Sequence, residues 1–256
     1  MSHLNLILEL TKRDFSERFA GSVLGSLWAF IWPIVQLLIY IVIFGQIMGS
    51  RLPGSSNIYS YSIYVSAGLI TWTAFANTIS RCTSIFLDKK HIISKINLSL
   101  PDLLLYIILS ESITFLITIG FFFVFLLITE YPLDQQLILF PFIYYLQQLF
   151  AFGFGLLAAS LTVFLRDLKE IVGIILQFWF WFTPIVYVRD ILPESVKKIL
   201  VYNPACIIIE AYQDIFVFHR IPDMNALMIL SILTHLLICF SYYVFQKLEK
   251  DIRDFI

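Results

Sequence analysis

Two ionisable side chains fall deep within long apolar stretches of this sequence. Glu111 and His235 occupy such positions, where a charge is costly and an ionisable residue is a candidate for proton transfer. A buried Glu or His can equally hydrogen-bond to a neighbouring helix. Because the set is so sparse, the hydrogen-bond interpretation is favoured over a proton relay.

The other residues capable of chemistry form no recognisable catalytic or metal site. The 4 histidines are not spaced with carboxylates as metal ligands, and the 3 cysteines are too far apart to indicate a metal site or a disulfide framework. Glu210 and Asp214, one helical turn apart, are the only pair of carboxylates suited to acid–base work. We predict no metal and no catalytic residue, and keep a membrane-embedded enzyme using this pair as an alternative.

The sequence contains no phosphate-binding loop. The pattern Gly-x-x-x-x-Gly-Lys is absent, and Gly153-Phe154-Gly155 lies inside an apolar stretch rather than after a strand. We therefore expect no cofactor in this chain, and any ATP and Mg²⁺ to be bound by a partner subunit.

Aromatic residues are the strongest compositional signal, at 17% of the chain. Five of them are consecutive, from Phe178 to Phe182, and consecutive residues point in every direction around a helix, so some of these rings should face inward. Sugar rings carry apolar C–H faces that can rest on aromatic faces, so such a lining would let a carbohydrate chain slide. Packing and anchoring at a membrane interface are the alternatives. The predicted lining comprises Trp28, Trp32, Trp72, Phe75, Phe178, Trp179, Trp181, Phe182 and Tyr187.

The elements that would position these residues are membrane-spanning helices. The chain has 256 residues, of which 59% are hydrophobic, and its mean hydropathy is +0.86. A net charge of -1 gives no basic field for nucleic acid. A span needs about 20 mostly apolar residues. Six segments meet this requirement: 24–48, 59–80, 103–128, 135–164, 170–188 and 225–246.

Basic residues predict the orientation of the chain. With the N-terminus in the cytoplasm, 12 of the 17 Lys and Arg residues fall in inside segments, and five, Arg51, Arg189, Lys197, Lys198 and Arg220, fall outside. We therefore predict that both termini are cytoplasmic.

Three segments outside the spans have distinctive patterns. Residues 1–20 carry charged and apolar residues on opposite sides, which is typical of a helix lying in the membrane interface. Residues 88–100 carry a short apolar stripe beside charge, which suits a helix docking into a groove of another protein; a solvated loop is the alternative.

The third segment, 188–224, predicts two short helices, Pro193–Tyr202 and Pro204–Phe218, with Asn203 as the N-cap of the second. Neither is long enough to span, which favours a hairpin dipping into the outer half of the membrane. An external helix on the lipid headgroups is the alternative.

Small residues recur at Gly21-x-x-x-Gly25 and Gly45-x-x-x-Gly49. This spacing predicts a small-residue face on the first membrane helix, suited to close helix packing or to a dimer.

Several stretches together resemble the membrane subunit of ABC-2-type polysaccharide exporters, a family that includes O-antigen, capsule and wall teichoic acid permeases. The likeness covers nearly the whole chain and is closest to the O-antigen type. The matching stretches are Arg18–Trp28, Trp32-Pro33, Tyr64–Leu69, Phe164–Glu170, Trp181–Ile185 and Tyr202-Asn203-Pro204.

The resemblance implies an all-α, polytopic membrane protein with a single domain over 1–256. It implies six spans, an interfacial helix at 1–20, a cytoplasmic coupling helix at 88–100 and a re-entrant pair of periplasmic gate helices at 191–218. The coupling residues would be Asp88, Lys89, Lys90, His91, Ile92, Ile93 and Lys95. The periplasmic gate would comprise Pro193, Asn203, Pro204, Glu210 and Asp214, and a cytoplasmic gate Arg13, Arg18, Arg166 and Asp167.

The implied function is that of the non-enzymatic, pore-forming subunit of an ATP-driven exporter of lipid-linked polysaccharide in the bacterial inner membrane. The chain would act as a homodimer with two copies of a separate ATPase. Export of capsular polysaccharide or wall teichoic acid is the alternative, and an ion-coupled flippase for lipid-linked sugars is another.

Overall fold

The chain is all-helical wherever its structure is described. The computed structural model describes residues 3–47, 52, 57, 59–93 and 99–255, and within them it contains ten α-helices and no β-strand. The helices are α1 (His3–Glu17), α2 (Trp28–Tyr40), α3 (Ser60–Asp88), α4 (Lys90–Ile93), α5 (Leu100–Ile128), α6 (Phe140–Thr162), α7 (Leu168–Trp181), α8 (Glu194–Leu200), α9 (Pro204–Phe216) and α10 (Met224–Phe255).

Four helical segments of the described chain are long and apolar enough to cross a membrane. They are Gly25–Gly45, Leu100–Ile128, Gln135–Thr162 and Met224–Phe255. They coincide with four of the six predicted spans, and the protein is membrane-embedded. The first combines a 3₁₀ turn, α2 and a π-helical segment that follows it at Ile41–Ile47.

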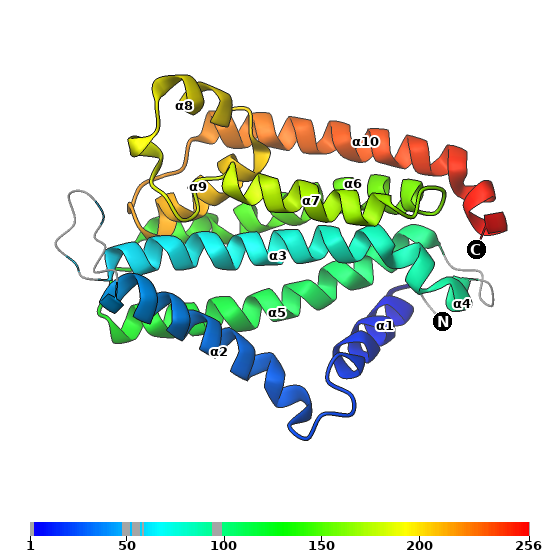
Figure 1. The fold of residues 1–256 in the computed structure, drawn as a ribbon, viewed down its shortest axis with the longest axis horizontal. Coiled ribbons are helices and arrows are strands. Elements are labelled where there is room, and N and C mark those ends of the chain that lie inside the picture. The colour runs from blue at the N-terminus through cyan, green and yellow to red at the C-terminus, as the bar shows by residue number, and fades with distance from the viewer. Residues whose placement is uncertain (1–2, 48–51, 53–56, 58, 94–98, 256) are drawn as a thin grey trace.

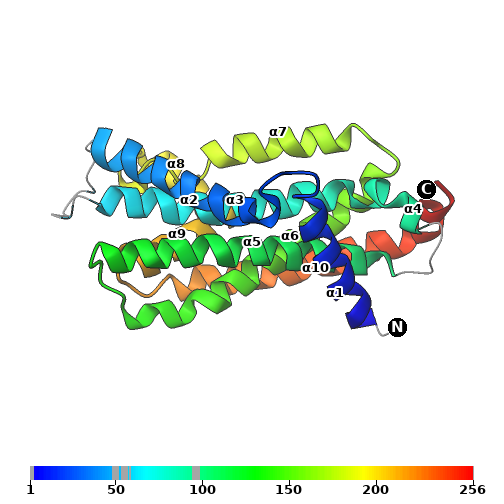
Figure 2. The ribbon, with the colours of Figure 1, turned by 90° about the horizontal axis from the view of Figure 1, so that it is seen from below.

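The predicted span 59–80 is a longer and more polar helix than the pattern indicated. α3 has 29 residues, about 43 Å at about 1.5 Å per residue. It runs through the centre of the bundle (Figure 1), and Figure 2 shows α5 and α6 on one side of it and α7 on the other. Its hydroxyls are satisfied internally: Thr71, Thr78 and Thr83 each donate to the carbonyl four residues earlier, at 2.8 Å. A helix surrounded by protein needs less hydrophobicity than one that faces lipid.

The predicted span 170–188 is helical only in part. α7 has 14 residues, about 21 Å, and ends at Trp181. Pro184 lies just beyond this end, and a proline cannot donate the next backbone hydrogen bond of a helix. Residues 182–188 continue without regular helix.

Both ends of the chain lie at the same end of the bundle (Figures 1 and 2). α4 and the connection between α6 and α7 lie there too, so the segments predicted to be cytoplasmic are on one side. The end of the π-helical segment that follows α2, the start of α3 and the α5–α6 connection lie at the opposite end. This arrangement agrees with an even number of crossings, and the direction in which each end faces stays a prediction.

Two clusters of buried side chains hold the bundle together. The larger joins α3, α5, α6 and α9 through residues such as Tyr64, Phe122 and Tyr212. The smaller, near the chain ends, includes Phe86 and Leu104. Gly155 is essential where α6 passes α3, because a Cβ there would lie 2.6 Å from Cys82 Cβ. The stretch Gly153–Gly155, predicted to lie inside an apolar segment, is therefore a site of helix packing.

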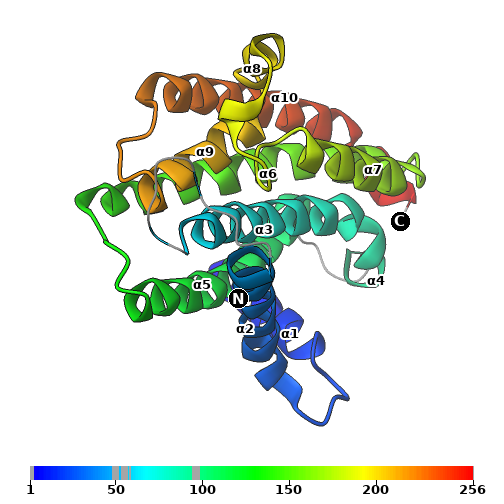
Figure 3. The same cartoon turned by 60° about the vertical axis from the view of Figure 1, so that its left-hand side comes forward.

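The first pair of spaced glycines is not a helix face, and that prediction was wrong. Gly21 and Gly25 lie in the connection between α1 and α2 with φ of +82° and +51°, a conformation that glycine adopts at little cost. They let the chain reverse, so that α1 and α2 project together from the rest of the bundle (Figure 3). Of the second pair, Gly45 approaches Ser62 of α3, and Gly49 lies outside the described residues.

Candidate functional site

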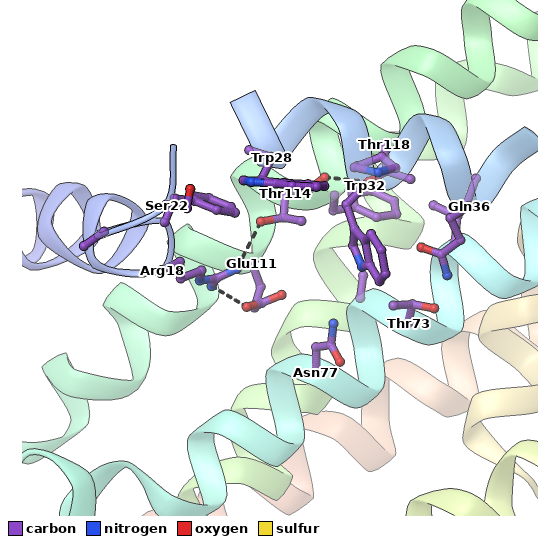
Figure 4. A pocket seen from close by; sticks show the side chains of 17 residues that line it. Arg18, Ser22, Trp28, Trp32, Gln36, Thr73, Asn77, Glu111, Thr114 and Thr118 are labelled. Carbon is purple, nitrogen blue, oxygen red and sulfur yellow. Dashed lines mark hydrogen bonds and ion pairs between the residues drawn. The ribbon is translucent and has the colours of Figure 1, made fainter. Parts of the chain in front are cut away.

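A cavity of about 730 Å³ lies between the α1–α2 connection, α2, α3 and α5 (Figure 4). One wall is aromatic and comes from α2, and the facing walls on α3 and α5 are polar. The indole of Trp32 points towards Thr73 and Asn77 of α3. The residues labelled in Figure 4 are Arg18, Ser22, Trp28, Trp32, Gln36, Thr73, Asn77, Glu111, Thr114 and Thr118.

Four charged side chains from three elements form one network at the edge of this cavity, here called the charge quartet: Asp14, Arg18, Arg81 and Glu111. Arg18 Nη2 lies 2.5 Å from Glu111 Oε1 and 3.3 Å from Asp14 Oδ2. Arg81 contacts the same carboxylates, at 2.6 Å for Glu111 and 2.5 Å for Asp14. The Ser110 hydroxyl donates to Asp14. Two guanidiniums facing two carboxylates make the quartet neutral.

The quartet fixes the position of α1. Glu111 is only 3% exposed, so its charge is stable there only with both arginines in place. Ile7, Thr11 and Asp14 are the residues of α1 buried against the bundle, and the Thr11 hydroxyl also lies 3.4 Å from the Tyr106 carbonyl oxygen. α1 is helical, as the pattern predicted, and it turns Ile7, Thr11 and Asp14 into the protein, whereas its place in the membrane interface stays a prediction.

The hydrogen-bonding interpretation of Glu111 is confirmed, because its carboxylate joins α5 to α3 and to the end of α1. His235 is elsewhere, on α10, and its Nδ1 lies 2.7 Å from the Ser231 carbonyl oxygen of the same helix. Sequence reasoning missed Asp14 and Arg81. The spacing of Ile7, Thr11 and Asp14 along one helix face was the available signal for the first of these.

The residues assigned to a cytoplasmic gate are not brought together within one subunit. Arg13 pairs with Glu17 at 2.6 Å on the exposed face of α1, whereas Arg18 belongs to the quartet. Arg166 and Asp167 are exposed in the connection between α6 and α7. A gate made of all four would require a second subunit, and their role stays a prediction.

The predicted coupling segment begins as a break in α3. α3 ends at Asp88, which accepts a hydrogen bond from Ser84, and α4 follows as a single turn. Ile93 is buried in the smaller core cluster, while Lys90 and His91 are exposed. Ile93 thus packs into this chain's own core, and docking of the segment into another protein stays a prediction. Lys95 and the rest of 94–98 lie outside the described residues.

The coupling segment also contacts α1. Lys89 Nζ lies 3.7 Å from Glu17 Oε2. The hydrogen bond from Arg13 lowers the pKa of Glu17, so this carboxylate is charged near neutral pH. α1 therefore contacts the C-terminal part of α3 at two places: at Arg81, and at Lys89 directly after the helix.

Three of the predicted lining aromatics are packing residues in this arrangement. Trp72 and Phe75 are buried, and both rings contact the half-buried Trp179 edge-on, at centroid distances of 6.4 and 5.6 Å. Phe150 of α6 completes the group. These rings hold α7 against α3 and α6, so they do not meet the expectation of an open lining.

The remaining predicted aromatics are not packed in the core in this way. Phe178 and Trp181 of α7, and Phe182 directly after it, are each more than 60% exposed. Trp32 of α2 is also more than 60% exposed, but it lies in the cavity wall. Trp28 is 37% exposed. Tyr187 is half-buried, and its hydroxyl donates to the Trp181 carbonyl oxygen at 2.9 Å. The outward face formed by Phe178, Trp181 and Phe182 is the one available to a lining.

The predicted gate helices exist as α8 and α9, slightly shorter than expected. Asn203 caps α9 by accepting from the backbone N–H groups of Ala205 and Cys206 and from Trp179 Nε1, the last at 2.6 Å. Pro204 is the first residue of α9, as predicted. Pro193 directly precedes α8.

α9 is packed against α3, α6 and α10, and most of its residues are buried. This favours the hairpin over the external helix. Its two carboxylates point to different partners: Arg189 donates twice to Glu210, at 2.7 and 2.9 Å, and Arg220 Nε lies 2.7 Å from Asp214. Each carboxylate is neutralised by its own arginine, so neither is a free base.

Comparison with known proteins agrees with this architecture. The family described as ABC-2 type transporter matches residues 5–217. The chain therefore belongs to the ABC-2 type transporter family, as the resemblance predicted.

Three curated relatives carry the name O-antigen export system permease protein RfbA. One from Myxococcus xanthus is 26% identical over 252 residues, covering 97% of this chain and 94% of the relative. One from Klebsiella pneumoniae is 28% identical over 246 residues, covering 96% and 92%. A second from Klebsiella pneumoniae is 28% identical over 215 residues, covering 83% and 80%.

Proposed function

We propose that this chain is the transmembrane subunit of an ATP-driven exporter that moves a lipid-linked, O-antigen-like polysaccharide across the bacterial inner membrane. The observation that carries the proposal is similarity to O-antigen export permeases over nearly the full length of both chains. The outward aromatic face of α7 and Phe182 supports it, because it offers C–H-binding surfaces without strong polar binding sites.

The energy would come from a separate ATPase subunit, present in two copies and binding ATP and Mg²⁺. The chain contains no phosphate-binding loop, and the Glu210 and Asp214 carboxylates are each neutralised by an arginine. The segment from Asp88 to Ile93 is the contact that we assign to the ATPase, since it presents exposed basic residues above a buried isoleucine.

The passage would form between two copies of the chain. We assign six crossings to each subunit: α2, α3, α5, α6, α7 with residues 182–188, and α10, with both termini in the cytoplasm. α8 and α9 would form the periplasmic gate, and α1 would lie in the cytoplasmic interface. Exposed apolar side chains cover α7 and the face of α2 that carries Phe30, Ile34 and Leu38, and a dimer joined through these faces would bury them.

Reconstitution in proteoliposomes with and without the partner ATPase tests the function. The chain alone should show no ATP hydrolysis, and the complex should move a lipid-linked glycan in an ATP-dependent manner. Transport that follows a proton gradient without ATP, and that is lost in Glu111→Gln or His235→Ala, would establish the ion-coupled flippase instead. Substantial hydrolysis by the chain alone would exclude the proposal.

A panel of lipid-linked O-antigen, capsular and teichoic acid glycans tests the substrate. We expect ATP-dependent transport of the O-antigen type. Transport of only the capsular or teichoic acid type would keep the export function and overturn the assigned substrate.

A further inference from the structure

The cavity beside the charge quartet has a polar wall on a helix that is otherwise enclosed. Asn77, Ser80 and Asp88 are the only exposed residues of α3. The Asn77 amide points into the cavity (Figure 4) and makes no side-chain hydrogen bond within the part of the chain that the structure describes. Because Asn77 is exposed to the cavity, its amide can bond to water or to a ligand there. The cavity is therefore built to hold a ligand that hydrogen-bonds, or the water that such a ligand displaces.

The opposite wall suits a carbohydrate. The Trp32 side chain is 68% exposed and faces Thr73 and Asn77 across the cavity. An indole face accepts the apolar C–H face of a sugar ring, while an amide and a hydroxyl on the other side can bond to its hydroxyl groups. The volume of about 730 Å³ is within the ~300–1,000 Å³ typical of small-molecule sites.

The electrostatics favour a neutral headgroup. Arg18 is the cation that lines the cavity, and it is already paired with Glu111 at 2.5 Å. A phosphate would have to compete with the two carboxylates of the quartet for the two guanidiniums. Sugar hydroxyls can instead donate to the remaining lone pairs of Glu111 and accept from Asn77 without breaking an ion pair.

The surroundings indicate that the ligand carries a hydrocarbon chain. The cavity lies against α2, where Val35 and Ile39, on the same side of the helix as Trp32, are exposed and apolar. An amphiphile could keep its tail along these residues while its head enters beside Trp32.

We propose that this cavity binds the sugar headgroup of a glycolipid within a single subunit, through sugar hydroxyls rather than through a phosphate. The proposal rests on the proposed function: the cavity would hold the sugar next to the lipid before the glycan enters the passage.

Photolabelling in nanodiscs of phosphatidylethanolamine and phosphatidylglycerol tests this assignment. The probe is octadecyl β-glucoside with a diazirine on its sugar, and the protein is the full-length chain with its partner ATPase. We expect labelled peptides from residues 28–36 and 70–77, with labelling reduced by unlabelled octadecyl β-glucoside. Asn77→Leu and Trp32→Ala should each weaken competition by about tenfold, the effect of losing roughly 1.4 kcal/mol of contact. Trp32→Phe should retain most of the binding.

Two matched substitutions serve as controls. Ser80→Ala changes another exposed polar residue of α3, and Leu38→Ala changes another exposed apolar residue of α2, and neither lines the cavity. Both should label as the unmodified protein does. Equal labelling in Asn77→Leu and Trp32→Ala would overturn the proposal. So would equal competition by octadecanol or by added phosphatidylglycerol, or a disulfide between two copies carrying Trp32→Cys, which would show that a second copy covers the cavity.

Export measured on the same preparations separates this proposal from the proposed function. Unmodified protein that exports glycan, with export and labelling both unchanged in Asn77→Leu, would overturn the cavity assignment alone. Unmodified protein that labels at the cavity but exports nothing with its ATPase would overturn the function alone.

Discussion

At the end of the bundle that holds both termini, α1 is attached to α3 and α5 through full charges, whereas at the opposite end α7 is attached to α3 and α9 mainly through neutral hydrogen bonds. The first junction is the charge quartet, closed by four ion pairs of 2.5–3.3 Å. The second is made mostly of neutral hydrogen bonds, with the pair Arg189–Glu210 as its charged contact to α9 among the described residues. Most of its bonds go to backbone carbonyls.

These carbonyl oxygens have no partner within a helix, because Pro184 prevents α7 from continuing. The Pro184 carbonyl oxygen accepts from Tyr64 Oη and from Gln213 Nε2, both at 3.0 Å, and the Val186 carbonyl oxygen accepts from the Tyr61 hydroxyl. Asn203 Nδ2 reaches the Phe182 carbonyl oxygen at 3.1 Å. A broken helix leaves backbone acceptors unpaired, and at membrane depth neighbouring side chains must satisfy them.

Substitutions at the two junctions should therefore lower the free energy of unfolding in different ways. Removing one member of the quartet leaves a buried charge uncompensated, so the loss is large and cooperative. Removing one neutral donor leaves a single acceptor unpaired while its neighbours remain, so each loss is small and local.

The largest effect should come from Glu111→Gln, which leaves Arg18 and Arg81 facing one carboxylate. We expect the free energy of unfolding to fall by about 3–5 kcal/mol, measured by SDS unfolding in lipid–detergent micelles. Hydrogen exchange should rise throughout α1. Glu9→Gln, an exposed change on α1, is the matched control. If the two variants lose the same stability, charge does not hold this junction.

A middle-sized effect should come from Asn203→Ala, which removes the cap of α9 and the partner of Trp179. A loss of about 2 kcal/mol is expected, because a cap and a buried hydrogen bond are lost together. Asn203→Asp keeps the acceptor but not the donor to Phe182, and should recover part of the loss. Asn225→Ala, at an exposed position near the start of α10, should change nothing measurable. Full recovery in Asn203→Asp would show that the bond to the Phe182 carbonyl oxygen contributes nothing.

A smaller effect is expected for Tyr64→Phe, because Gln213 still donates to the Pro184 carbonyl oxygen. The expected loss is about 1 kcal/mol, and faster hydrogen exchange should be confined to residues 182–188. Tyr242→Phe, exposed on α10, provides the comparison. A global loss of protection would mean that the neutral junction is as cooperative as the charged one.

The smallest effect on stability should come from Lys89→Ala, since its pair with Glu17 is long and near the surface. Less than ~0.5 kcal/mol should be lost. The same variant should nevertheless lower the amount of glycan exported per ATP hydrolysed, if motion of the ATPase reaches α1 through this contact. Lys197→Ala breaks another Lys–Glu pair, with Glu194, at the opposite end of the bundle and should leave that ratio unchanged. An unchanged ratio in Lys89→Ala would remove this contact from the coupling path.

Local pattern was sufficient for most of the helices but not for all of their ends. The apolar lengths located four helical segments that are long and apolar enough to span, and Asn203-Pro204 located the start of α9, because a cap and an N1 proline act within one turn. The same local reasoning failed at Gly21 and Gly25, where their spacing fits a helix but their backbone forms a reversal.

The candidate site was less visible, because its members are distant in sequence. From the sequence alone one could predict membrane helices rich in aromatic residues, one acid in the third apolar segment, and no phosphate-binding loop. Only the tertiary structure decided that Glu111 meets Arg18 and Arg81, that Trp72, Phe75 and Trp179 pack together, and that Trp32 faces Asn77 across a cavity. Hydropathy records the preference of each residue for lipid, but the choice between packing and an open face depends on which helices are neighbours.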